Sequence, residues 1–359
     1  MESIPIQKQL KEFKARIDVE MEHYLDRVIS ETALRDPFMT EALRYVKTLA
    51  LAGGKRLRAA FMYMGYLAGG GEDRERMIRT AVSIELIHLF LLIHDDIIDR
   101  DEKRHSTTTV HEHFRALGKR SAFRRDTAHF GNSMAIIVGD MVGALGNQII
   151  FESGFPAERV LQALSKLQDI ISLTVIGEAE DIMIEYRGTA SEREILDMYE
   201  HKTARYTIDG PLQLGLLLAG EHSELGDALQ KYAVPVGIAF QIQDDILGIF
   251  GSEEKLGKPV GSDIEEGKIT ILVSKALELT TKEAGKELLR ILGRGRDLSP
   301  RESARFREIL TTSGALDAAR ELARRSLEEG KSAIVSPAIP EEPKRFLLDI
   351  AEYMERREC

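Results

Sequence analysis

Two groups of closely spaced aspartates are the residues whose types and spacing best suit chemistry. Asp95, Asp96 and Asp99 form the segment DDIID, and Asp244 and Asp245 form a second group further along the chain. Residues four apart share one face of a helix, so Asp95 and Asp99 should point the same way. Such carboxylates are costly beside an apolar helix unless a cation balances them. Because oxygen ligands suit a hard ion, we predict a Mg²⁺ site that bridges carboxylates and phosphates.

Basic residues occur where a bound diphosphate would need them. The segment GGKRLR at 53–58 places Lys55 and Arg58 three residues apart at the start of an expected helix. Backbone N–H groups and the helix dipole favour an anion there. Taken alone, each of these residues could equally be a solvated surface charge. They therefore indicate a diphosphate site only in combination with the aspartates. Further candidate cations of this kind are Arg104, Lys202, Lys258 and Lys268.

The elements that must position these groups are helices. Apolar residues recur at three- and four-residue spacing along nearly every long segment, and no run alternates as a strand would. We therefore expect an all-α fold of about a dozen helices. Segments 83–98 and 232–250 are apolar on all sides, which is typical of helices at the centre of a bundle. Each contains one aspartate group at or near its end, so we expect one acidic cavity.

Composition limits the classes of function. The 359 residues carry 49 Lys and Arg against 59 Asp and Glu, a net charge of −10 that disfavours nucleic acid as a partner. The one cysteine, Cys359, excludes a disulfide framework and a cysteine-based zinc site. Apolar runs are interrupted by charged residues before the roughly 18 positions that a membrane span needs. We expect a cytoplasmic protein of one domain, residues 1–359, with no transmembrane segment and no signal peptide.

Taken together, the motifs resemble those of the trans-isoprenyl diphosphate synthases, also called polyprenyl synthetases. Five motifs follow the family's order: GGKRLR, DDIID with Arg104, the pair Lys202–Thr203, FQIQDD, and the glycine–lysine segment 257–268. The resemblance implies an all-α, single-domain helical bundle around a deep central cavity, usually as a homodimer. The implied reaction is Mg²⁺-dependent head-to-tail condensation of isopentenyl diphosphate with an allylic diphosphate. Its products are a short all-trans prenyl diphosphate and pyrophosphate.

The resemblance also implies roles for the matching residues. The metal cluster would be held by Asp95, Asp99 and Asp244, supported by Asp96 and Asp245. The leaving diphosphate would be bound by Arg104, Lys202 and Lys258, with Lys268 nearby. Isopentenyl diphosphate would be held by Lys55, Arg58 and His88. The developing allylic cation would lie beside the carbonyl of Lys202, the hydroxyl of Thr203 and Gln241.

Two positions depart from the family pattern, and two others bear on product length. His105 replaces the second of two arginines, which weakens a contact to isopentenyl diphosphate or makes it pH-dependent. Gly248 stands where many members carry a third aspartate. Phe90 and Leu91 lie five and four positions before Asp95, where bulky residues close the tunnel floor in the family. One aromatic there resembles the geranylgeranyl (twenty-carbon) synthases, with the farnesyl (fifteen-carbon) synthases as the nearest alternative.

Other functions remain open from the sequence. Glu20–His23 and Glu85–His88 have the spacing of di-iron carboxylate bundles, although that class leaves GGKRLR and both aspartate groups unexplained. A catalytically silent subunit of a heteromeric synthase would accommodate His105 and Gly248. A head-to-head squalene- or phytoene-type synthase would use different aspartate motifs and would not need the GGKRLR site.

Overall fold

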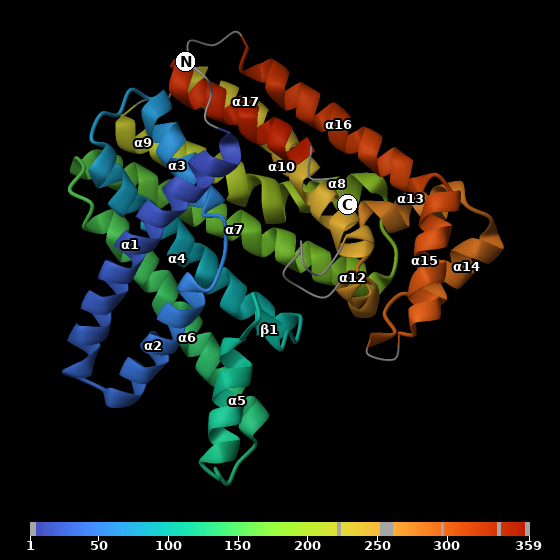
Figure 1. Ribbon diagram of the computed structural model, residues 1–359, viewed down its shortest axis with the longest axis horizontal. Helices are drawn as coiled ribbons and strands as arrows, with labels where there is room; N and C mark the ends of the chain where they lie inside the picture. The colour runs from blue at the N-terminus through green and yellow to red at the C-terminus, as the bar shows by residue number, and fades with distance from the viewer. Residues whose placement is uncertain (1–4, 221–223, 252–260, 296–297, 336–338, 356–359) are drawn as a thin grey trace.

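The fold is a bundle of helices with one minimal hairpin, as seen in a computed structural model of the chain (Figure 1). The structure describes residues 5–220, 224–251, 261–295, 298–335 and 339–355. The first half of the chain forms α1 (Ile6–Ala33), α2 (Pro37–Leu51), α3 (Leu57–Ala68), α4 (Arg74–Ile98), β1 (Lys103–Arg104), β2 (Thr107–Thr108), α5 (Val110–Arg120), α6 (Thr127–Phe151) and α7 (Ala157–Arg187). The second half forms α8 (Glu192–Tyr199), η1 (Glu200–Asp209), α9 (Gly210–Ala219), α10 (Glu224–Phe250), α12 (Ser262–Glu266), α13 (Ile271–Leu279), α14 (Lys282–Ile291), α15 (Pro300–Thr312), α16 (Ala315–Ala333) and α17 (Glu341–Glu355). The all-α prediction is confirmed.

Helix boundaries follow capping chemistry in the sequence. The side chain of Asp36 accepts a bond from the backbone of Met39 at the start of α2, whose first residue is Pro37. Ser191 with Glu194 forms a capping box that starts α8. At Gly210–Pro211 the chain changes helix type without a break, because η1 is a π-helix that passes directly into α9.

The central helices are buried on most sides, as their apolar sequences predict. In α4 the residues from Met77 to Ile87 are almost all buried, and α10 is similarly enclosed. α4 packs along α6, while α10 packs against η1 and α16. In Figure 1, α5 projects from the lower side of the bundle, and α14 and α15 lie at its right-hand end. The aspartate groups therefore belong to helices held firmly by the core.

Three helices are long and apolar enough, by length and composition alone, to cross a membrane: α6, α7 and α10. The sequence argument had expected no such segment. Within the apolar windows, 56% of α6 and 61% of α10 is buried inside the bundle, against 39% of α7. Core packing accounts for the apolar character of α6 and α10, whereas α7 presents much of its apolar face outward.

Candidate active site

The first aspartate group lies at the C-terminal end of α4, and the β1–β2 hairpin brings Arg104 back onto it. Nε of Arg104 donates to Oδ1 of Asp96 at 2.6 Å, and its Nη2 donates to Oδ2 of Asp95 at 3.2 Å. Nη2 also lies 3.5 Å from Oδ2 of Asp101. Burial raises the pKa of Asp96 to about 7, although the Arg104 charge acts in the opposite direction. One guanidinium thus holds three carboxylates together.

The π-helix η1 presents Lys202 and Thr203 between two central helices. A Cβ at Gly177 of α7 would lie 2.3 Å from the backbone nitrogen of Lys202, and one at Gly237 of α10 would lie 2.5 Å from Cα of Ala204. Only glycine permits this approach on either side. This close packing on both sides fixes the irregular backbone of η1. π-helical segments often occur at functional sites.

Two acids of α7 hold the Lys202 side chain, and the sequence analysis did not identify them. Nζ of Lys202 lies 2.6 Å from Oδ2 of Asp181 and 2.8 Å from Oε2 of Glu178. Burial raises the pKa of Glu178 despite the attraction of Lys202. In the sequence, these two acids stand out by their three-residue spacing directly after Gly177. That signal is weak, because acids on a long helix more often face solvent.

A chain of hydrogen bonds connects η1 to the second aspartate group on α10. The hydroxyl of Thr203 donates to Oε1 of Gln241 at 2.8 Å, and Nε2 of Gln241 donates to Oδ1 of Asp245 at 2.8 Å. The hydroxyl of Tyr199 donates to the other oxygen of Asp245 and accepts from the backbone of Ile271 at 3.0 Å. Asp245 therefore orients the Gln241 amide, and the sequence analysis did not foresee Tyr199.

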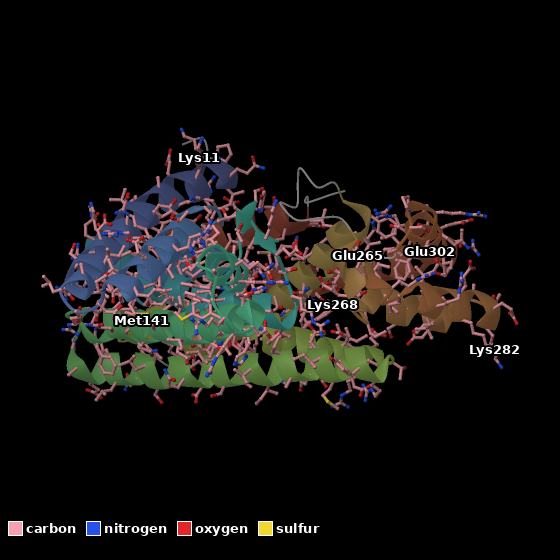
Figure 2. All side chains as sticks on the ribbon, turned by 90° about the horizontal axis from the view of Figure 1, so that it is seen from below. Lys11, Met141, Glu265, Lys268, Lys282 and Glu302 are labelled. Carbon is pink, nitrogen blue, oxygen red and sulfur yellow. The ribbon has the colours of Figure 1, made fainter. Side chains whose placement is uncertain are left out.

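Lys268 reaches the first aspartate group from the connection after α12. Its Nζ lies 3.2 Å from Oδ2 of Asp99 and 3.0 Å from Oε2 of Glu266. Figure 2 shows Lys268 well inside the outline of the molecule, whereas Lys282 lies at its edge. Burial raises the pKa of Glu266 to about 7. Lys258, a further predicted cation, lies outside the described residues.

A cavity of about 370 Å³ brings the basic segment and both aspartate groups together. Among the predicted site residues, those that line it are Lys55, Arg58, His88, Asp96, Arg104, His105 and Asp244. The other described site residues do not line this cavity; among them, Asp95 contacts the lining through Arg104.

The basic end of the cavity is built from α3, α4 and η1. Nη2 of Arg58 donates to Oγ1 of Thr207 at 2.9 Å, and its guanidinium lies 4.4 Å from the ring centre of Tyr206. Burial, together with the charge of Arg58, lowers the pKa of His88 well below its ordinary value. Nδ1 of His88 and Nε of Arg58 are buried without a hydrogen-bond partner among the described residues. These polar groups suit a ligand that supplies acceptors.

The structure also places the two departures from the family pattern. Burial and the charges of Arg104 and Arg56 lower the pKa of His105, so its ring is neutral at pH 7. A Cβ at Gly248 would lie 2.7 Å from Oδ2 of Asp263 on α12. The carboxylate of Asp263 thus takes the space that a side chain at position 248 would need.

Phe90 and Leu91 face different neighbours. Leu91 lies one helical turn before Asp95 and so shares its face of α4. The Phe90 ring makes an edge contact with His94 at 4.9 Å, and a Cβ at Gly143 of α6 would lie 3.2 Å from it. Phe90 therefore packs against α6, and Leu91 lies nearer to the aspartates.

The donor chemistry of this region fits a divalent metal ion. Within the described residues no three potential ligands already converge on one point, because Arg104 and Lys268 lie between the carboxylates. The carboxylates in contact with Arg104, Lys202 and Lys268 outnumber these three cations. Burial also raises the pKa of several of these carboxylates. A hard cation with oxygen ligands would offset that excess charge. Residues able to hold it are Asp95, Asp99 and Asp244, with Asp96 and Asp245 behind them.

Comparison with known proteins gives one consistent result. The polyprenyl synthetase family model matches residues 37–310. A geranylgeranyl diphosphate synthase of Methanosarcina mazei is 35% identical over 93% of this chain and 95% of its own length. A geranylfarnesyl diphosphate synthase of Aeropyrum pernix is 32% identical over 94% and 99%. The crystal structure of a Corynebacterium glutamicum geranylgeranyl pyrophosphate synthase, complexed with isoprenyl diphosphate and magnesium, superposes with a TM-score of 0.92 at 31% identity, covering 97% of this chain and 99% of that one.

The buried Asp245 predicts a pH-dependent gain in stability on substitution. Burial and the nearby Asp263 raise its pKa to about 8, so the folded state retains a proton that the unfolded chain loses above the ordinary pKa of 3.8. This costs stability increasingly as pH rises from about 4 to 8. Asp245→Asn should therefore raise the free energy of unfolding more at pH 7 than at pH 4.5, by about 3 kcal/mol.

Denaturant unfolding at the two pH values measures this difference, with Asp169→Asn as a control at an exposed position of α7. An equal stability change for Asp245→Asn at both pH values would show that the carboxyl is ionised when buried.

Proposed function

Because the chain belongs to the polyprenyl synthetase family, we propose that its cavity binds isopentenyl diphosphate at the GGKRLR end and an allylic diphosphate at the aspartate end. The protein is a prenyltransferase that performs short-chain trans-prenyl condensation. One observation carries the assignment to this cavity: Lys55 and Arg58 line it together with Asp96 and Asp244. Two anionic substrates could therefore meet with their reactive ends between the two groups.

The basic end suits a non-allylic diphosphate. Lys55 and Arg58 supply charge, and the unsatisfied Nε of Arg58 and Nδ1 of His88 supply hydrogen-bonding positions. His105 adds a neutral ring where the family carries an arginine. A bound dianion would favour protonation of that ring, so binding at His105 should strengthen as pH falls.

The aspartate end suits the leaving diphosphate. We propose Mg²⁺ as the ion held by Asp95, Asp99 and Asp244, and this ion would neutralise charge on the departing diphosphate. Arg104, Lys202 and Lys268 would turn from their carboxylate partners towards the phosphate oxygens, with Lys258 as a further candidate. Nearby carboxylates raise the pKa of Lys202, which keeps it charged at neutral pH.

Ionisation of the allylic substrate leaves a carbocation that this chain's own groups must stabilise and protect. The oxygens of Thr203 and Gln241 are fixed in direction by the bond between them and by Asp245. We place them, with the carbonyl of Lys202, beside the cation, where oriented dipoles cost no reorganisation. The double bond of isopentenyl diphosphate attacks this centre, and the released diphosphate takes the proton that is lost. Apolar walls such as Leu89 and Leu92 exclude water.

Product length depends on the residues before Asp95. Leu91 lies on the Asp95 face, and Phe90 closes the contact between α4 and α6 one position earlier. Five residues correspond to about 7.5 Å along a helix, so a growing prenyl chain would reach these side chains after a limited number of carbons. We propose a twenty-carbon product, with a fifteen-carbon product as the alternative.

The exposed apolar face of α6 and α7 supports a homodimer. Ile137 of α6 is 52% exposed, and Ile176 and Met183 of α7 are 49% and 67% exposed. Ile176 and Met183 lie seven residues apart and so form one stripe along α7. Because apolar patches of this kind mark association surfaces, we propose that a second copy of the chain covers it. We propose a cytoplasmic location for this dimer.

The competing readings lack support from the geometry. Glu85, which the di-iron reading needs as a ligand, accepts a bond from the backbone of Ala59 and faces Arg56, so both of its carboxylate oxygens are already engaged. A silent subunit is the remaining alternative to an active enzyme. It would keep the fold and lose turnover.

Turnover is tested with purified protein, Mg²⁺, isopentenyl diphosphate and each of dimethylallyl, geranyl and farnesyl diphosphate. Products should form with Mg²⁺, disappear with a chelator and return on adding the metal. Asp95→Asn should lower kcat about 100-fold or more, since it removes one metal-binding carboxylate. Asp317→Asn, at an exposed position of α16, is the control. If no primer gives a product, the chain is a silent subunit.

Phe90→Ala tests the length assignment. Removing the ring opens the contact between α4 and α6, so product analysis by mass spectrometry should show longer chains than wild type. Phe123→Ala, an exposed phenylalanine outside the site, should leave the distribution unchanged. An unchanged distribution for Phe90→Ala would remove this residue from the tunnel floor.

Light scattering tests the homodimer. Wild type should show twice the chain mass of 40.2 kDa, and Ile176→Glu should shift the protein to monomer because it buries a charge in the interface. Leu34→Glu, at an exposed leucine after α1, should remain dimeric. A monomeric wild type would contradict the proposal.

A further inference from the structure

Arg56 is the one residue of the segment 53–58 that combines a charged side chain with a buried position. Lys55, Arg56 and Arg58 all line the cavity, yet Arg56 is only 7% exposed. Its backbone is left-handed, with φ 56°, at the start of α3. That conformation is unfavourable for a non-glycine residue, so the rest of the structure must impose it.

The Arg56 guanidinium joins three helices. Nε donates to Oδ1 of Asp18 on α1 at 2.8 Å, and Nη2 donates to the backbone carbonyl of Ala50 near the end of α2. Nη1 lies 3.6 Å from Oε2 of Glu85 on α4. The other oxygen of Glu85 accepts from the backbone nitrogen of Ala59 at 3.0 Å, in the first turn of α3.

These bonds fix the backbone on both sides of Lys55 and Arg58. The side chains of Arg56 and Glu85 are 8% and 3% exposed, so their interaction is poorly screened by solvent. Arg56 and Glu85 also border the cavity, but their polar atoms are engaged by the contacts to Asp18, Ala50 and Ala59. Asp18 itself does not line the cavity and lies before residue 37, outside the segment that the family model matches.

We propose that Asp18, Arg56 and Glu85 form a positioning network that holds Lys55 and Arg58 in place for isopentenyl diphosphate. The proposal rests on the proposed function, because it takes the basic end of the cavity as the site of that substrate. The network connects α1 to the basic end of the cavity through Asp18, in addition to Met21 of α1, which lines the cavity itself.

Asp18→Asn and Arg56→Lys test the network from its two ends. Each loses part of the charged hydrogen bonding, so the KM for isopentenyl diphosphate should rise about tenfold while the KM for the allylic diphosphate stays within about twofold. The double variant should be little worse than the more affected single variant, because both break one interaction. Lys47→Met is the matched control, since Lys47 ties α2 to Glu22 and Asp26 of α1 and does not touch the loop.

Calorimetric binding of isopentenyl diphosphate gives a second readout that does not require turnover. The expected result is a weaker Kd for both network variants and an unchanged Kd for Lys47→Met. Unchanged binding in Asp18→Asn and Arg56→Lys, an equal loss for both substrates, or the same loss in the control would overturn the network. A wild-type protein that binds isopentenyl diphosphate nowhere would instead overturn the proposed function.

Discussion

Buried negative charge at one end of the bundle is the constraint on which the rest of the structure depends. Carboxylates of α4, α7, α10 and α12 meet there, and burial raises the pKa of Asp96, Asp245 and Glu266. Such a group is unfavourable unless positive charge is brought to it. In the proposed function, divalent cations and diphosphate anions would together satisfy both the acids and the lysines and arginines around them.

Each of these side-chain cations lies on a segment that departs from regular α-helix, between helices that are regular. A two-strand hairpin carries Arg104 back to α4, a π-helix carries Lys202 between α7 and α10, and the connection after α12 carries Lys268. The helices on either side are locked by core packing, so these irregular segments hold defined positions. At the basic end, the buried Arg56 serves the loop of Lys55 and Arg58 in the same way.

Much of the fold and part of the site could be predicted because their signals are local. Apolar helices ending in Asp95 and Asp244, and the GGKRLR segment, are legible in the sequence. Glu178, Asp181 and Tyr199 were not found, because their partners lie elsewhere in the chain and their own sequence context is ordinary. The absence of a membrane-spanning segment stays a prediction, since three described helices are long and apolar enough by length and composition, and α7 is the least buried of them. Arg56 resembled its neighbours in sequence, and only its left-handed backbone separates it from them.

The proposed function requires both aspartate groups to hold the same diphosphate through bound metal ions. A crystal structure of the protein with Mg²⁺ and a non-cleavable allylic thiolodiphosphate tests it most directly. If the proposed function is right, metal ions bound by Asp95 and Asp99, and others bound by Asp244, all contact the diphosphate. The proposed function also predicts that Arg104 and Lys202 contact phosphate oxygens. Diphosphate bound elsewhere, or metal held by only one aspartate group, would contradict the account.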